Sequence, residues 1–393
     1  MQAAISRTTL GGVPAGLLAL FVFSDSYKQI TLNFTPIDLT LLLAVLLTAI
    51  CLSNFLIRGT SKNLLVLLGA VIILLLPQAL WTNFNEYGFK KLYLFFTVTI
   101  LAGIAPSLVL RTERNALSFY NAILILALCV GLGYYISPPQ LANEDYSGAA
   151  TISVGRLTGF AAAICFVRFF DKRHALLWIV LFVLLLFFTL STGNRQSIVA
   201  LACAIFFSLL LMSRSVHNLR NIFLSFALIV PLGYFALINF TDILPEGSLD
   251  RVTTFLSGKE NVFDESRGTL YTIAFRNISV FGHGWGYFST INSVDNYPHN
   301  ILLELLVEYG LVTAISLMAL IAALCFRAWV VYKKIPAANS ELRRANILTF
   351  MGLVFYFVAA NFSGDLNSNK ALLCFLFLAC ILPWQSRAEL KHE

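Results

Sequence analysis

The chain has 393 residues, of which 58% are hydrophobic and only 12% are charged, and its net charge is +7. A soluble domain has roughly 25% charged residues and about 45–50% apolar residues, so this composition excludes a water-soluble globule. The long apolar runs, such as 41–50 and 176–190, lack the alternating polarity of an outer-membrane strand. They predict an all-α integral membrane protein.

The apolar runs, separated by short polar segments, predict about twelve transmembrane helices. In chain order these are expected at residues 10–24, 37–57, 63–80, 92–110, 116–137, 151–170, 174–190, 196–213, 219–240, 301–330, 345–362 and 371–384. The first run could also be a signal peptide, but no convincing A-x-A site follows it. We therefore interpret it as an uncleaved helix.

The distribution of basic residues predicts the orientation of these helices, because cytoplasmic loops retain Lys and Arg. If both termini are cytoplasmic, most of the 27 basic residues fall on the cytoplasmic side. These topogenic charges account for the net charge without a nucleic-acid partner. We expect a single polytopic domain over 1–393, with a large extracytoplasmic loop at 241–300 between the ninth and tenth helices. This loop is predicted to contain short amphipathic helices. All seven cysteines fall in apolar runs, which predicts packing residues without disulfides.

Two arginines lie at the extracytoplasmic ends of predicted helices. Arg156 is part of a Gly-Arg-Leu-Thr-Gly segment in an otherwise apolar helix, and Arg195 lies in a short turn between two helices. A charge at membrane depth costs roughly 3 kcal/mol on insertion scales, so it usually has a partner or a task. The alternative is that each side chain extends to the lipid headgroups.

A third arginine, Arg267, begins a predicted amphipathic helix that Asp264 or Ser266 could cap. The positive end of a helix and a guanidinium together favour a bound anion. The alternative is a surface salt bridge from Arg267 to a neighbouring carboxylate. Arg251 and Arg276 compete with it for the anion-binding role.

Three alternating glycines, Gly282, Gly284 and Gly286, follow in the same loop. They predict a tight backbone that approaches another segment closely. The segment is not a dinucleotide-binding motif, because it lacks the preceding strand and the required spacing.

The next segment contains the candidate general base. Pro298 is suited to a helix start, which would place His299 and Asn300 in the first turn. The helix dipole and nearby arginines disfavour the cationic imidazole there, and a general base requires the neutral form. The alternative is an interfacial histidine satisfied by water or backbone, and His283 is the rival base. No carboxylate pair or Cys/His spacing in the extracytoplasmic loops predicts a metal site.

At these residues the sequence resembles the superfamily of bacterial O-antigen ligases, O-antigen polymerases and protein O-oligosaccharyltransferases. The segments that carry the resemblance are Ser266–Gly268, Gly282–Gly286, Pro298–Glu304 and Glu308–Gly310, together with Arg156 and Arg195 in the order of the helices. The resemblance implies a fold like that of GT-C glycosyltransferases in the bacterial inner membrane, with a periplasmic active site. A ligase transfers a glycan en bloc from undecaprenyl diphosphate to a sugar hydroxyl of lipid A-core.

The resemblance also implies roles for individual residues. His299 would act as the base, while Arg195 and Arg267 would stabilise the leaving diphosphate with help from Arg156, in a metal-independent, inverting reaction without a cofactor. The further residues expected to contact the substrates are Asn300, Arg276 and Tyr271. The expected partners are the lipid-linked donor, the lipid A-core acceptor and membrane lipids, around a monomer.

We expect the ligase activity. The alternatives are a polymerase or protein O-oligosaccharyltransferase of the same superfamily and, from another class, a transporter or lipid-linked sugar flippase. A transporter would predict charges near the bilayer midplane and internal repeats. The sequence shows charges mainly at helix ends, and no repeat.

Overall fold

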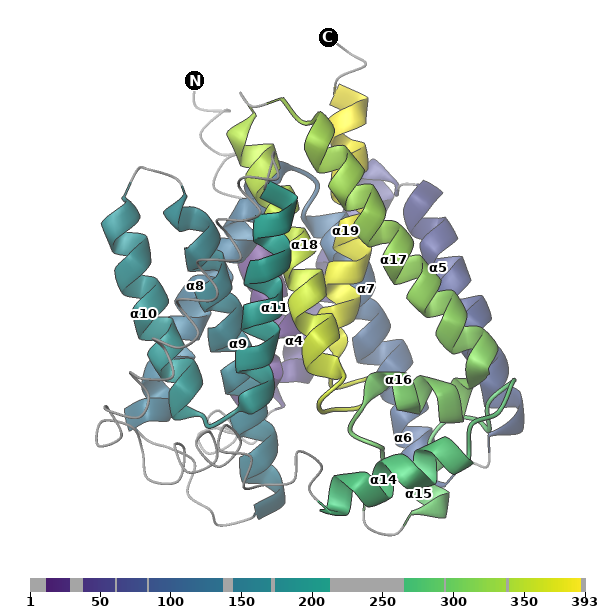
Figure 1. Cartoon of the computed structure of the whole chain (residues 1–393). Coiled ribbons are helices and arrows are strands. Elements are labelled where there is room, and N and C mark those ends of the chain that lie inside the picture. The colour runs from purple at the N-terminus through teal and green to yellow at the C-terminus, as the bar shows by residue number, and fades with distance from the viewer. Residues whose placement is uncertain are drawn as a thin grey trace.

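The computed structural model describes residues 12–28, 38–60, 62–82, 85–136, 144–170, 174–212, 265–292, 295–336 and 339–389. Within these ranges the chain is helical and contains no β-strand, which confirms the predicted all-α class. Figure 1 shows the long helices running between the two ends of a bundle. Seven of the helices in these ranges are long and apolar enough to cross a membrane, so the chain is a multi-pass membrane protein.

Every predicted membrane helix has a counterpart except 219–240, which lies outside the described residues. The α-helices are α2 (Gly12–Val22), α4 (Leu39–Arg58), α5 (Lys62–Leu75), α6 (Glu86–Leu94), α7 (Ile100–Val109), α8 (Glu113–Ile136), α9 (Glu144–Phe169), α10 (Ala175–Ser191), α11 (Arg195–Met212), α14 (Glu265–Arg276), α15 (Phe288–Ile291), α16 (Ile301–Glu304), α17 (Gly310–Lys334), α18 (Ser340–Ala360) and α19 (Lys370–Glu389). The 3₁₀ turns are Ser24–Ser26 and Leu76–Trp81, and the π turns are Phe95–Thr99 and Leu305–Tyr309.

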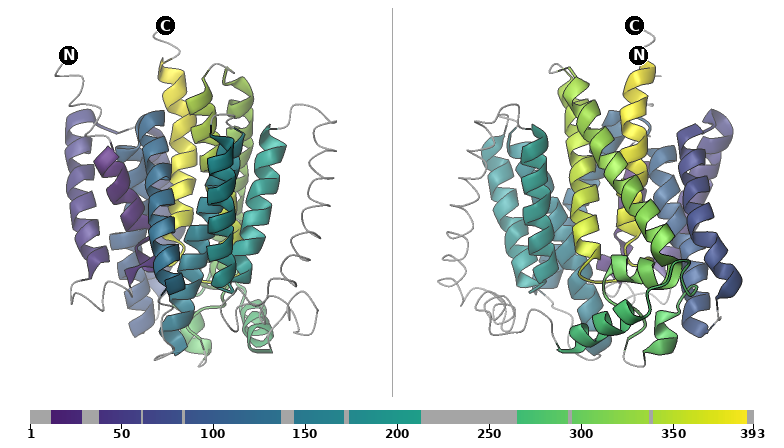
Figure 2. Two further views of the ribbon diagram at one scale, coloured as in Figure 1. Left: turned by 90° about the vertical axis from the view of Figure 1, so that its left-hand side faces the viewer. Right: turned by 45° about the vertical axis from the view of Figure 1, so that its right-hand side comes forward.

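The helices α14, α15 and α16 gather at one end of the bundle (Figure 1), and both turned views in Figure 2 show the same arrangement. The helix α14 is amphipathic, as predicted, because Leu270 and Ala274 are buried against Phe288 and Leu303 while Thr272 is exposed. This end carries the described part of the predicted 241–300 loop. The division of the chain into a membrane domain and this loop stays a prediction.

Two membrane helices are interrupted near this end by π turns. One joins α6 to α7, and the other, Leu305–Tyr309, joins α16 to α17. Because the regular helix breaks after the second turn, the carbonyls of Val307 and Glu308 have no partner further along the helix. They accept the backbone N–H groups of His283 and Gly284 at 3.1 and 2.9 Å. The glycine-rich loop is therefore held against this helix break.

The same loop packs tightly against α6. Gly286 has φ +72°, and a Cβ atom there would lie 2.5 Å from the Cα of Gly88. The buried Trp285 donates its backbone N–H to the Thr82 hydroxyl at 2.9 Å and its indole N–H to the Leu75 carbonyl at 3.2 Å. The close approach predicted from the alternating glycines is confirmed, and its function is to fasten the loop to two helices.

Replacement of Gly286 by Ala is expected to destabilise the protein by about 3 kcal/mol, because the new methyl group meets α6 backbone and the residue is held at positive φ. The unfolding temperature of the detergent-solubilised protein measures this loss. The matched control is Gly133→Ala in α8, where no heavy atom lies within 4 Å of the added Cβ. Equal unfolding temperatures of the two variants would contradict the packing argument.

Candidate active site

A fully buried ion cluster lies beside the glycine-rich loop. The Lys91 ammonium is 2.6 Å from Oε1 of Glu304 and 2.5 Å from Oε2 of Glu308, and all three side chains are 0% exposed. The predicted helix 92–110 left Lys91 just outside it, but α6 begins at Glu86, so this lysine lies inside the helix. The cluster joins α6 to α16 and the following π turn.

The connection between α18 and α19, residues 361–369, is fastened to the same cluster. The Leu366 N–H donates to Oε1 of Glu304 at 3.1 Å, and Nδ2 of Asn367 donates to the Lys91 carbonyl at 2.8 Å. Three segments that are distant in sequence therefore meet at one buried set of charges.

Arg156 is hydrogen-bonded to the same 361–369 connection. Its guanidinium donates through Nη1 to Oδ1 of Asn369 at 2.9 Å and through Nη2 to Oε1 of Gln196 at 3.0 Å and to the carbonyls of Ala359 and Ser363 at 3.0 and 2.8 Å. Arg156 is only 7% exposed. The alternative in which this arginine extends to lipid headgroups is therefore wrong. Its Nε has no hydrogen-bond partner among the described residues.

Arg195 lies next to this interaction. It is the first residue of α11, half-buried, and its neighbour Gln196 accepts a hydrogen bond from Arg156. Arg156 itself is deeper in its helix than predicted, because α9 begins at Glu144 and not at 151. Twelve residues of α-helix place it roughly 18 Å from that start. The structure thus brings the segments of these two arginines together.

His299 adopts a conformation that the sequence did not suggest. Its φ is +54°, in the left-handed region, and its ring lies 4.5 Å, centroid to centroid, from that of Tyr297. The imidazole is 20% exposed, with Nε2 3.5 Å from Oδ1 of Asp295. Its Nδ1 is buried without a hydrogen-bond partner among the residues that the structure describes.

Asn300 explains why the helix starts at Ile301, as the hydropathy pattern predicts, and not at Pro298. Its side-chain oxygen accepts the N–H of Leu302 at 2.9 Å, which makes Asn300 the N-cap of α16, and its Nδ2 donates to the Asn361 carbonyl at 2.9 Å. The expectation of a helix start at Pro298 was wrong, because an asparagine side chain satisfies the first helical N–H groups better. His299 consequently precedes the helix, and Asn300 has a structural role there.

The electrostatic surroundings favour neutral imidazole. Burial is the largest influence and lowers the pKa of His299, the Asp295 carboxylate opposes this, and the Arg267 guanidinium lowers the pKa further. Burial likewise raises the pKa of Tyr297 to about 12, against the opposing charge of Arg156. The neutral form of the imidazole is therefore favoured, with burial as its main cause, and the role of His299 as a base stays a prediction. The charge of Arg267 therefore acts on His299, and the charge of Arg156 acts on Tyr297.

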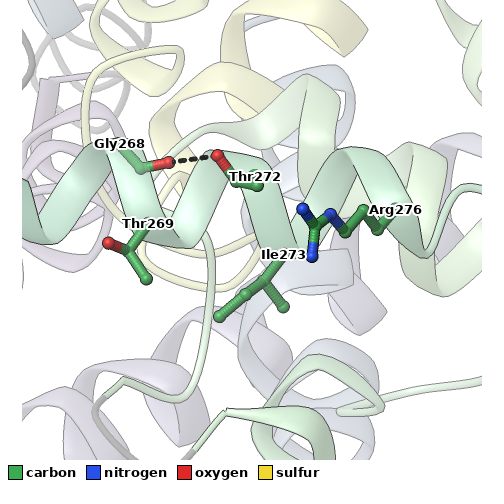
Figure 3. A pocket seen from close by; sticks show the side chains of 5 residues that line it. All are labelled: Gly268, Thr269, Thr272, Ile273 and Arg276. Atoms are coloured by element: carbon green, nitrogen blue, oxygen red, sulfur yellow. Dashed lines mark hydrogen bonds between the residues drawn. The ribbon is translucent and has the colours of Figure 1, made fainter.

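The remaining predicted residues lie on α14. Arg267 is half-buried in the first turn, and Tyr271 packs against the buried side of the helix. Arg276 is exposed in the last turn and lines an open pocket of about 530 Å³ with Gly268, Thr269, Thr272 and Ile273 (Figure 3). Nine residues of helix separate Arg267 from Arg276 by roughly 13 Å and by about half a turn, so the two side chains start from opposite faces of α14 and do not converge on one phosphate group.

Some sequence predictions fall elsewhere. Arg251 and Asp264 lie outside the described residues. The rival base His283 stacks on Tyr287 with ring centroids 4.3 Å apart, within the fastened glycine loop. The ion cluster was missed, although two glutamates four residues apart in an apolar run were a signal that a buried cation should exist.

The all-α membrane fold thus joins the segments that carry the buried Arg156, the buried Lys91 with its two carboxylates, and an imidazole whose neutral form is favoured. Residues 180–318 match the family model described as O-antigen ligase. Over this range the match agrees with the resemblance inferred from the motifs, and proteins of that family perform O-antigen ligase- or polymerase-type glycan transfer in membranes. The range contains Arg195, Arg267 and His299, whereas Arg156 and Lys91 lie outside it. A search of curated proteins found no match.

Replacement of Lys91 by Met should destabilise the protein by about 3–5 kcal/mol, because it leaves two buried carboxylates without a counter-charge. The unfolding temperature in detergent again measures the loss. Lys90→Met is the matched control, since Lys90 is adjacent but exposed. Wild-type stability of the Lys91 variant would show that the ion cluster does not hold this end together.

Proposed function

We propose that the protein is an O-antigen ligase with a GT-C-like architecture. It would transfer a glycan en bloc from undecaprenyl diphosphate to a sugar hydroxyl of lipid A-core, at the periplasmic face of the bacterial inner membrane. The observation that carries this proposal is His299, a buried imidazole favoured in its neutral form, under the influence of Arg267 and within the segment matched to the O-antigen ligase family. Because both substrates are lipid-anchored, their reacting groups meet at a membrane surface, and the candidate site lies at one end of the bundle.

In this reaction the acceptor hydroxyl gives its proton to His299 while its oxygen attacks the anomeric carbon of the donor. The bond from that carbon to the diphosphate oxygen breaks, and the diphosphate leaves with the electron pair. Attack from the face opposite the leaving group inverts the anomeric centre. The diphosphate is a good leaving group and needs no general acid, so the chain must supply a base and positive charge.

The arginines divide this task. We assign Arg195 and Arg267 to direct contact with the diphosphate, because guanidinium groups bind phosphate oxygens in a two-pronged geometry without a metal ion. Arg156 already donates to four protein acceptors, so its contribution is positive potential and a fixed 361–369 connection. We assign Arg276, with the pocket of Figure 3, and Tyr271 to the glycan, and Asn300 to holding His299 at the helix start.

A polymerase would use the same donor and differ in its acceptor, and a protein O-oligosaccharyltransferase would use a protein hydroxyl. A transporter or flippase would need a charge that exchanges partners during transport. The described Lys91 instead pairs with two carboxylates at one end of the bundle. We therefore favour chemistry over transport.

The test is complementation of a ligase-deficient Gram-negative strain, read as lipopolysaccharide on a gel. The wild-type chain should restore the O-antigen ladder, and His299→Ala should lose it, because removal of a general base costs about 10²–10⁴-fold in rate. The control is His283→Ala, a half-buried histidine of the same region.

A full ladder from the His299→Ala variant, at wild-type protein level, would remove its assigned role. Failure of the wild-type chain in this strain, together with conversion of single repeats to a ladder in a polymerase-deficient strain, would establish the polymerase instead.

The pH dependence of transfer provides a second test. Because the pKa of His299 is lowered, the neutral base persists above it, and activity is lost only as the pH falls below the ordinary histidine value of about 6.5. The acid limb is the part of the pH profile in which activity falls as the pH is lowered. Arg267→Ala removes a positive charge near His299 and raises its pKa, so the midpoint of the acid limb should move to higher pH. The same variant should lower kcat about 10²–10³-fold.

Transfer by the purified protein is measured from about pH 5 to 8, the range in which an ordinary histidine changes charge. Lys90→Ala is the control for loss of an exposed cation. An acid limb that Arg267→Ala leaves unmoved would contradict the electrostatic link to His299.

A further inference from the structure

The two ring nitrogens of His299 have different surroundings. Nε2 lies 3.5 Å from Oδ1 of Asp295, whereas Nδ1 is buried and has no hydrogen-bond partner among the described residues. A neutral imidazole carries its hydrogen on one nitrogen and a lone pair on the other. A carboxylate only accepts hydrogen bonds, so Asp295 favours the hydrogen on Nε2 and leaves the lone pair on Nδ1.

The backbone brings these two side chains together. The positive φ of His299 costs about 1–3 kcal/mol in a residue other than glycine, and such strain persists only where the surroundings enforce it. The surroundings here are the Asn300 cap on one side and the Tyr297 ring on the other. The turn that results places Asp295 against the imidazole, although the carboxylate remains 38% exposed.

We propose that Asp295 is a positioning residue for the transfer reaction, holding His299 in the tautomer that presents Nδ1 to the acceptor hydroxyl. This inference rests on the proposed function. The hydroxyl proton passes to Nδ1, which makes the ring an imidazolium with its other N–H directed at the Asp295 carboxylate. The carboxylate stabilises that cation and is not itself protonated. A distance of 3.5 Å is long for this contact, and such contacts shorten when substrates bind.

The charges that act on the ring allow a specific prediction. Asp295 and Asp365 favour the imidazolium, Arg267 disfavours it, and the Tyr297 ring packs against it. Loss of the Asp295 carboxylate should therefore move the acid limb of the pH profile to lower pH. This is opposite to the shift expected for Arg267→Ala, so the two variants form a matched pair.

The first experiment compares Asp295→Ala and Asp295→Asn in transfer by the purified full-length protein. Asp295→Ala should lower kcat about 10–100-fold, as loss of a group that orients a functional histidine does. The KM for the lipid-linked donor should not change, and the acid limb should move down. Asp295→Asn should have a lower kcat than Asp295→Ala, because the asparagine amide can donate to Nε2 and stabilise the tautomer that carries its hydrogen on Nδ1.

Asn296→Ala, an exposed neighbour in the same turn, is the control and should retain both kcat and the acid limb. A purely structural role for Asp295 would reduce the amount of folded protein without moving the acid limb. Wild-type kcat and an unmoved acid limb in Asp295→Ala would overturn the proposal.

A second measurement is independent of transfer. In protein labelled with ¹⁵N-histidine, with His299 assigned by comparison with His299→Gln, the nitrogen shifts report which nitrogen carries the hydrogen. The wild type should show Nε2–H, and Asp295→Ala should show a mixture of tautomers and a lower His299 pKa. Nδ1–H in the wild type would overturn the proposal even if transfer occurs. An Nε2–H signal in a chain that transfers no glycan would instead reject the proposed function alone.

Discussion

The pairing of the Lys91 ammonium with the carboxylates of Glu304 and Glu308 is the interaction on which the candidate site depends. A charge in this buried position has no water to stabilise it, so each group must keep its partner. The pairing consequently fixes α6 against α16 and the π turn that follows. Because the Gly284 N–H donates to the backbone carbonyl of Glu308, the glycine-rich loop is held in the same position.

The candidate site is assembled on this support from distant parts of the chain. The 361–369 connection is hydrogen-bonded both to the ion cluster and to Arg156, and it also accepts a hydrogen bond from Asn300. Asn300 in turn fixes the position at which α16 begins, and with it the turn that contains His299. The proposed transfer reaction would gain from such rigidity, because fixed charges need no reorganisation when a leaving group becomes anionic.

Hydropathy predicted the presence of the helices better than their ends. The helix expected from 92 begins at Glu86, where Asn85 caps it, and the helix expected from 151 begins at Glu144. In both cases polar residues were interpreted as loop, although a helix can continue beyond the apolar part of a membrane. Hydropathy reports which solvent a segment prefers, whereas caps and packing decide where its hydrogen-bonded turns begin.

By itself the sequence determined that the chain is an α-helical membrane protein, and its motifs indicated His299 and Arg267 as residues for glycan transfer. Only the tertiary structure decided that Lys91 pairs with Glu308, 217 positions away, and that Asp295 faces the imidazole of His299. Composition and local spacing are enough to predict the membrane helices and the candidate residues, because the preference of a side chain for lipid, water or a phosphate group depends on that side chain alone. The two contacts depend on which groups the packing of the helices brings within bonding distance. No local sequence pattern specifies those pairs.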